Sequence, residues 1–158
     1  MDRWVVLGHV GIALWFVAGL LGRNLTLVSA RSRERVEPVA ELVALAGWFE
    51  RLLVIPGSFG VLALGLLAAW AQDRPLAGPG NGWLLASLLL YVPLFDLVPL
   101  VFVPRRRIFD RALDDARQRG ALTPALASAL RDPVVAAARV LELLVVAAIL
   151  TLMVVKPF

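Results

Sequence analysis

The chain has 158 residues, of which 60% are hydrophobic, and it carries a formal net charge of +4. Soluble domains are about 45–50% apolar, and here the apolar excess gathers in four long blocks. The composition therefore excludes an ordinary soluble domain and indicates a protein whose solvent is the lipid bilayer. The absence of cysteine excludes disulfides, thiolate metal sites and a cysteine nucleophile.

Residues 4–28 form the first predicted span, which carries no charge between Arg3 and Arg23 unless His9 is protonated. About 19 apolar or small residues at 1.5 Å each cover roughly 28 Å, enough to cross a hydrocarbon core. The N-terminus lacks the basic region and the small-residue cleavage site of a signal peptide. We therefore expect this span to be retained.

Residues 52–71 form the second predicted span. The preceding residues 39–51 are either a tilted extension of the same helix or a separate interfacial helix, and Trp48 suits the headgroup boundary. Pro56 should bend the second span near its inner end. Small residues, which let membrane helices approach closely, recur in both spans: Gly8, Gly11, Ala18, Gly19, Gly22, Gly57, Gly60, Gly65, Ala68 and Ala69. The first two spans should therefore pack together.

The third predicted span covers residues 83–103, follows a Pro- and Gly-rich connection with Asn81 as its N-cap, and is interrupted by Pro93 and Pro99. Residues 104–133 are predicted to form a connection that contains helices. Two helices are expected there, the first ended by Gly120 and the second begun by Thr123-Pro124, because these residue types favour helix ends and starts. Asp132-Pro133 begins the fourth span, residues 134–155, in the same way.

Arginines are distributed unequally among the connections. Three follow the first span in SARSRERVEP, one lies between the second and third spans, and seven lie in residues 104–133. By the positive-inside rule the connections at residues 29–51 and 104–133 face the cytoplasm, and both termini face outward from a prokaryotic-type inner membrane. These basic loops suit anionic lipid. The basic helix expected in the second of these loops holds three aspartates, Asp110, Asp114 and Asp115, and a single aromatic residue, Phe109, which argues against a nucleic-acid surface.

His9 is the only histidine, so a bis-histidine site within one chain is excluded. A histidine inside a membrane span is a candidate haem ligand, metal ligand or proton carrier, and the alternative is an interfacial histidine bonded to a loop carbonyl. Met153 lies near the same outer surface and is the candidate sixth haem ligand. The alternative for Met153 is plain packing.

Six charged residues fall in the cytoplasmic half of the four spans when depth is counted at 1.5 Å per residue: Arg23, Glu50, Arg51, Asp96, Arg139 and Glu142. A charge at such depth is costly unless it is paired or hydrated. We expect Arg51 to pair with Asp96, and Arg23 or Arg139 to pair with Glu142. Asp96, between two prolines, should be the least replaceable acid. The cluster serves either to fix helix register or as a substrate or proton path.

Three stretches carry a resemblance: GHVGIALWFVAGLLGR, PGSFGVLALGLLAAW, and a third span that leads into a basic loop and DPVV. Together they resemble a family of predicted integral membrane proteins, a domain of unknown function of four-helix type. The first helix is also similar to the start of the HemJ-type haem-containing protoporphyrinogen oxidases, which implies that His9 is a haem ligand. That family also relies on a lysine inside a later helix, whereas the only lysine here is Lys156.

The sequence thus predicts an all-α, polytopic membrane protein. It should form a four-transmembrane-helix bundle with a helical cytoplasmic loop between the third and fourth spans, in a single domain of residues 1–158. We expect no catalytic residues and no metal site. The leading hypothesis is a non-enzymatic accessory subunit or small transporter-like component, with a second copy or a membrane complex as partner. The alternative is a haem b-binding redox protein that uses His9 and Met153.

Overall fold

A computed structural model describes residues 2–76, 78 and 80–157 of the chain. The regular elements of this part are all helical, so the predicted all-α class is confirmed. They are α1 (Asp2–Ala30), α2 (Val36–Phe49), the π-helical segment η1 (Glu50–Val54), α3 (Ile55–Ala71), α4 (Gly82–Leu97), the π-helical segment η2 (Val98–Phe102), α5 (Val103–Arg119), α6 (Pro124–Leu130) and α7 (Pro133–Val155).

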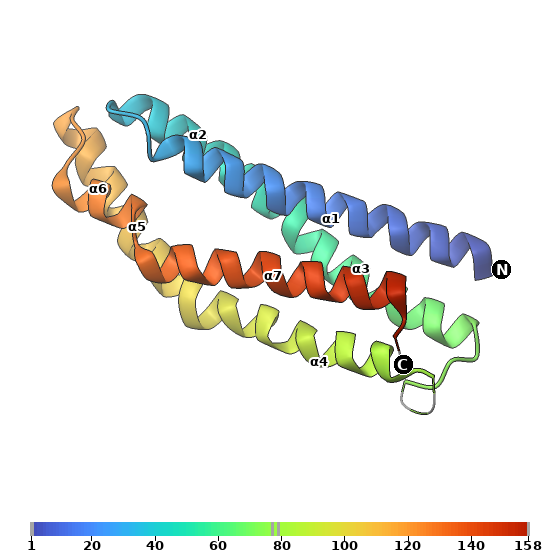
Figure 1. Cartoon of the computed structure of the whole chain (residues 1–158). Coiled ribbons are helices and arrows are strands. Elements are labelled where there is room, and N and C mark those ends of the chain that lie inside the picture. The colour runs from blue at the N-terminus through green and yellow to red at the C-terminus, as the bar shows by residue number, and fades with distance from the viewer. Residues whose placement is uncertain (1, 77, 79, 158) are drawn as a thin grey trace.

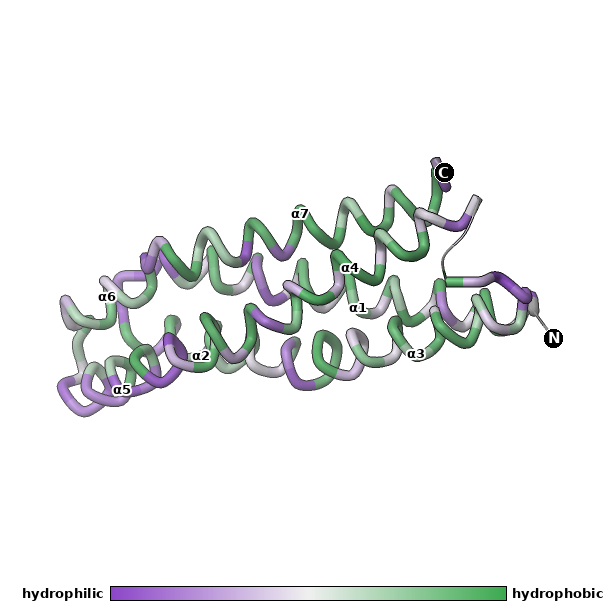
Figure 2. Tube along the Cα trace, turned by 90° about the horizontal axis from the view of Figure 1, so that it is seen from below, coloured by the Kyte–Doolittle hydropathy of each residue, from purple (hydrophilic) through white to green (hydrophobic). Residues whose placement is uncertain are grey.

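Four helices of the described chain are long and apolar enough to cross a membrane. The second of them runs without a break through α2, η1 and α3, so residues 39–51 extend the second span as helix rather than forming a separate one. Both termini lie at one end of the bundle, and α5, α6 and the start of α2 lie at the other (Figure 1). Hydrophilic residues gather at that second end, while the long helices are mostly hydrophobic (Figure 2).

The four long helices form two pairs. In the first pair α1 packs along α2, η1 and α3, and in the second pair α4 packs along α7. One apolar cluster joins the pairs, with buried residues from both: Phe16, Leu20, Val54, Val61, Tyr91, Val145, Val146 and Ile149. The Tyr91 hydroxyl also donates a hydrogen bond to the Ser58 carbonyl at 2.7 Å. Apolar packing and this bond between α4 and α3 hold the two pairs in register.

The helices of the first pair lie close together because glycines on one helix leave room for side chains of the other. A Cβ on Gly57 would lie 2.9 Å from the Cβ of Phe16, and one on Gly19 would lie 2.5 Å from the Cβ of Leu53. Real Cβ atoms do not approach so closely, so larger residues would force the helices apart. The small residues of the first two spans therefore mark their contact, as their recurrence predicts.

A second apolar core lies at the hydrophilic end, between α2, α5 and α6. Its buried residues are Val36, Val39, Ala40, Leu113, Ala116 and Leu126. The predicted helix ends are confirmed for α5, which stops at Gly120 with a φ of 63°, and for α6, whose Thr123 hydroxyl accepts from the Leu126 N–H at 3.3 Å. Asn81 does stand at the N-cap of α4, but its side chain makes no capping bond.

Each π-helical segment ends two residues before a proline, η1 before Pro56 and η2 before Pro104. A proline cannot donate to the carbonyl four residues earlier and clashes with it in a regular α-helix. The wider π turn relieves this conflict. The Leu52 carbonyl, which Pro56 cannot serve, accepts a hydrogen bond from the Trp15 indole at 3.2 Å. The expected irregularity near Pro56 thus takes the form of a π segment, a feature common at functional sites.

Candidate functional site

Arg23 of α1 is the centre of a buried ionic cluster, with only 6% of the residue exposed. Its guanidinium pairs with Glu50 of η1 at 2.6 Å and with Glu142 of α7. The guanidinium carbon also lies 5.7 Å from the ring centroid of Phe102 in η2. One side chain of α1 therefore contacts all three of the other long helices, and two of those contacts come from π segments.

The two ion pairs do not use every hydrogen-bond donor of Arg23. Its Nε atom is buried and has no hydrogen-bond partner among the described residues. A charge in an apolar bundle is stable only when it is paired or hydrated, and two carboxylates shared by one guanidinium meet that requirement. The cluster fixes the helices at one depth, about seven residues or roughly 10 Å before the end of α1.

The structure does not bring Arg51 and Asp96 together. Both residues are exposed in the described chain, and neither forms an ion pair there. The Arg51 Nε instead donates to the Gly47 carbonyl, one turn earlier on the same helix, at 3.1 Å. The expected Arg51–Asp96 pair is therefore wrong, because Arg51 turns back along its own helix to Gly47, while Glu50 faces inward to Arg23.

A cavity of about 750 Å³ lies beside the Arg23 cluster, towards the hydrophilic end of the bundle. Its walls come from α1, α2, both π segments, the start of α3, α5, α6 and α7. Sites for small molecules usually have volumes of about 300–1,000 Å³. The charged residues of its lining are five arginines and three acids: Arg23, Arg105, Arg106, Arg131, Arg139, Glu50, Asp110 and Asp132. The remaining lining is largely apolar. The cavity can thus hold both a charged and an apolar part of one molecule.

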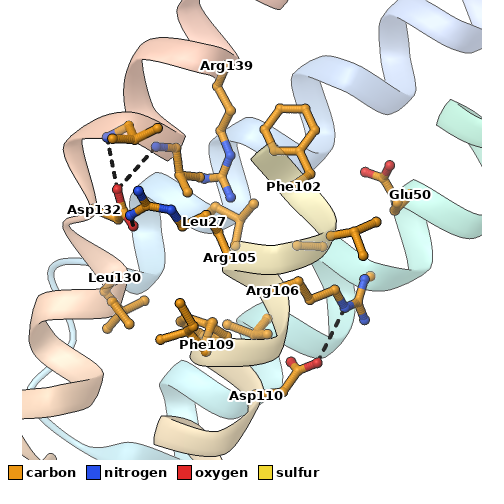
Figure 3. A pocket seen from close by; sticks show the side chains of 18 of the residues that line it. Leu27, Glu50, Phe102, Arg105, Arg106, Phe109, Asp110, Leu130, Asp132 and Arg139 are labelled. Atoms are coloured by element: carbon orange, nitrogen blue, oxygen red, sulfur yellow. Dashed lines mark hydrogen bonds and ion pairs between the residues drawn. The ribbon is translucent and has the colours of Figure 1, made fainter. Parts of the chain in front are cut away.

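Most charges around the cavity are paired, as Figure 3 shows in part. Arg106 pairs with Asp110 at 3.6 Å, and Arg105 pairs with Asp132. Asp132 also caps α7, because one of its oxygens accepts from the N–H groups of Val134 and Val135 at 2.9 and 3.3 Å. Burial acts to raise the pKa of the Asp132 carboxyl, but these hydrogen bonds together lower it below its ordinary value.

Arg139 differs from these arginines. It extends from α7 towards the middle of the cavity (Figure 3), and it forms no ion pair in the part of the chain that the structure describes. Glu142, three residues further along α7, is bound by Arg23 instead. The cavity therefore presents one partly buried guanidinium with its hydrogen-bond donors unused.

His9 packs against α3. A Cβ on Gly65 would lie 3.0 Å from the His9 Cε1 atom and 3.4 Å from its Nδ1 atom, which is buried and has no hydrogen-bond partner in the described chain. The His9 ring therefore lies against α3 at Gly65. Met153 packs within two apolar clusters. The described contacts of these two residues are packing contacts and give no support for a haem site.

Sequence reasoning missed the residues that shape the cavity. The sequence places Phe102 and Arg105 only in a span or a loop, assigns Asp132 only the start of the fourth span, and does not predict the π segments. The signal that could have pointed to these segments is the proline two residues after each of them, Pro56 and Pro104, although Pro93 stands in regular α-helix.

Comparison with known proteins agrees with this architecture. No curated protein and no solved structure matches the chain. A family model described as "Predicted integral membrane protein (DUF2269)" matches residues 4–157, which is nearly the whole chain. The chain is therefore a four-helix integral membrane protein that belongs to the DUF2269 family, whose function is unknown.

Proposed function

We propose that this protein is a small transporter-like component or accessory subunit of the membrane that binds an amphiphilic molecule in the cavity beside Arg23. The observation that carries the proposal is the cavity itself, about 750 Å³ in volume. It lies where both π segments meet the buried cluster, and π segments in membrane helices often accompany binding sites.

Exposed apolar residues of the lining suggest how such a molecule would enter. Five large apolar residues of the lining are exposed: Ile55, Val98, Val103, Ile108 and Val134. In a bilayer, these side chains would connect the cavity with the space that lipid tails occupy. A molecule with a polar head and an apolar tail could therefore enter sideways from the bilayer, without crossing the hydrophilic end of the protein.

We also propose an orientation. The connections at the hydrophilic end hold most of the arginines, and the positive-inside rule places such connections in the cytoplasm. In a prokaryotic-type inner membrane, α5 and α6 would then be cytoplasmic and both termini would face outward. The cavity would open near the cytoplasmic leaflet.

Binding of amphiphiles to purified protein tests the proposal. The probes are three molecules with the same dioctanoyl tails: the neutral dioctanoylglycerol, the zwitterionic phosphatidylcholine and the anionic phosphatidic acid. Native mass spectrometry from a neutral maltoside detergent would measure their affinities. Ala129→Phe should abolish binding of whichever probe binds, because Ala129 lines the cavity. The matched control is Ala137→Phe on the exposed face of α7. Binding that Ala129→Phe leaves intact would refute the proposed function.

Haem binding through His9 is the alternative. The His9 ring packs against α3 at Gly65, which gives this alternative less support than the cavity gives amphiphile binding. An optical spectrum of protein expressed with ample haem distinguishes the two proposals. A Soret band that disappears in His9→Ala would favour the haem alternative over amphiphile binding.

A further inference from the structure

The charges that line the cavity do not balance. Its three acids are each engaged: Glu50 by Arg23, Asp110 by Arg106 and Asp132 by Arg105. Two of its arginines form no ion pair in the described part of the chain, Arg131 and Arg139. Glu142, the second partner of Arg23, adds a fourth carboxylate against the five arginines of the lining. The cavity therefore keeps an excess of one positive charge.

Of Arg131 and Arg139, Arg139 points more clearly to a bound ligand. It lies six residues after the start of α7, about 9 Å into the helix at 1.5 Å per residue, and it is partly buried. An arginine at such depth is costly unless an anion or water accompanies it. Its planar guanidinium is suited to bidentate binding of a phosphate or carboxylate group.

Two arginines at the edge of the cavity, beside Gly47, add to its positive potential. A Cβ on Gly47, a lining residue, would lie 3.8 Å from Nη2 of Arg51 and 4.0 Å from Nη2 of Arg106. Two guanidiniums therefore flank one point of the wall. Among the described residues, Arg106 has a carboxylate partner, Asp110 at 3.6 Å, and Arg51 has none. An anion that approaches this point is attracted before it reaches Arg139.

We infer that the cavity binds a lipid with an acidic, phosphate-type headgroup that comes from the bilayer, and that Arg139 is its main headgroup ligand. The headgroup would lie between Arg139 and the arginines at the edge, and the tails would follow the exposed apolar residues of the wall, such as Ile55 and Val98. The inference rests on the proposed function, since it names the chemical class of the molecule that the same cavity takes.

The dioctanoyl probes test this inference when they are combined with variants of two arginines. For the native protein, phosphatidic acid should bind at least about 10-fold more tightly than dioctanoylglycerol, the gain expected from charge-assisted hydrogen bonds. Arg139→Gln should bring this ratio close to one and leave dioctanoylglycerol binding unchanged. The matched control is Arg117→Gln, because Arg117 is exposed on α5 and does not line the cavity. It should keep the full ratio.

The possible results distinguish a failure of the inference from a failure of the proposed function. If dioctanoylglycerol binds in the cavity as tightly as phosphatidic acid, the inference is wrong and the proposed function stands. If Arg139→Gln and Arg117→Gln lower the ratio equally, the effect is one of general charge and the headgroup role of Arg139 is refuted. If none of the three probes binds in a way that Ala129→Phe abolishes, both proposals fail.

A final competition experiment distinguishes a bound lipid from a bound free anion. Inorganic phosphate in the same detergent should not displace phosphatidic acid, because it lacks the tails that the apolar wall holds. Displacement by inorganic phosphate at a similar concentration would show that the site takes a free anion and would overturn the assignment to a lipid.

Discussion

Replacing Arg23 should destabilise the protein more than any other change to its buried charges. Arg23 bonds to Glu50 and Glu142 and lies over the Phe102 ring. Arg23→Met removes the cation but keeps most of the side-chain volume. Both carboxylates then remain between apolar helices without their partner.

The magnitudes follow from the exposure of the partners. Removing one member of a buried ion pair costs about 3–5 kcal/mol because an uncompensated charge is left behind, and this range applies to Arg23→Met. The Glu142 side chain is 11% exposed, so Glu142→Gln should cost about 1.5–3 kcal/mol, the loss of a hydrogen bond to a charged group. The Glu50 side chain is 25% exposed. Glu50→Gln should therefore cost about 1 kcal/mol or less.

The free energy of unfolding, measured by titrating maltoside micelles with dodecyl sulfate, checks this order. Arg139→Met is the matched control, since it removes an arginine of similar position that has no ion pair among the described residues. It should leave stability unchanged or raise it. The double variant Arg23→Met/Glu142→Gln should be less unstable than the sum of the single variants, by about 0.5–3 kcal/mol.

Two results would refute this reasoning. Strictly additive losses in the double variant would mean that Arg23 and Glu142 do not interact in the folded protein. A loss in Arg139→Met as large as that in Arg23→Met would mean that any arginine at this depth stabilises the bundle, whether or not it has a carboxylate partner.

The remaining predictions concern packing, the cap of α7 and orientation. Gly57→Ala should lower stability by about 1–3 kcal/mol, whereas Gly11→Ala should be harmless because no atom lies within 4 Å of the added Cβ; equal thermal shifts would contradict the close α1–α3 contact. Asp132→Ala should cost about 1 kcal/mol through the lost cap. Because the folded pKa of Asp132 is lowered, its contribution is present above the ordinary aspartate pKa and disappears as the pH falls through the folded value, so a stability difference that persists in acid would exclude this origin. In whole cells an impermeant maleimide should label Lys156→Cys and not Arg33→Cys, and labelling at position 33 would reverse the proposed orientation.

Much of the fold could be read from local sequence features. The long apolar stretches predict four spans, and the structure has four helices that could cross a membrane. Thr123 and Asp132 act as N-caps, and Gly120 ends α5 in the left-handed conformation that glycine adopts at low cost. These features depend on a few neighbouring residues, so no knowledge of distant contacts is needed.

The pairing of charges could not be read in the same way. Counting depth along each helix correctly places Arg23, Glu50, Arg139 and Glu142 near one level, but it also pairs Arg51 with Asp96, which the structure leaves exposed and apart. Depth is set by the rise per residue, which is regular. The direction of a side chain around the helix depends on every turn before it.

Sequence by itself therefore determined the four apolar helices and those ends that a capping residue marks, such as Gly120, Thr123 and Asp132, because hydrophobic length and capping are local properties. Only the tertiary structure decided which charges meet and where the cavity lies. The physical reason is the pair of π segments, each of which adds about one residue to a turn and rotates the following side chains by roughly 100°. Glu50 and Phe102, one from each π segment, both contact Arg23. Arg139, on α7, lines the cavity without an ion pair in the described part of the chain.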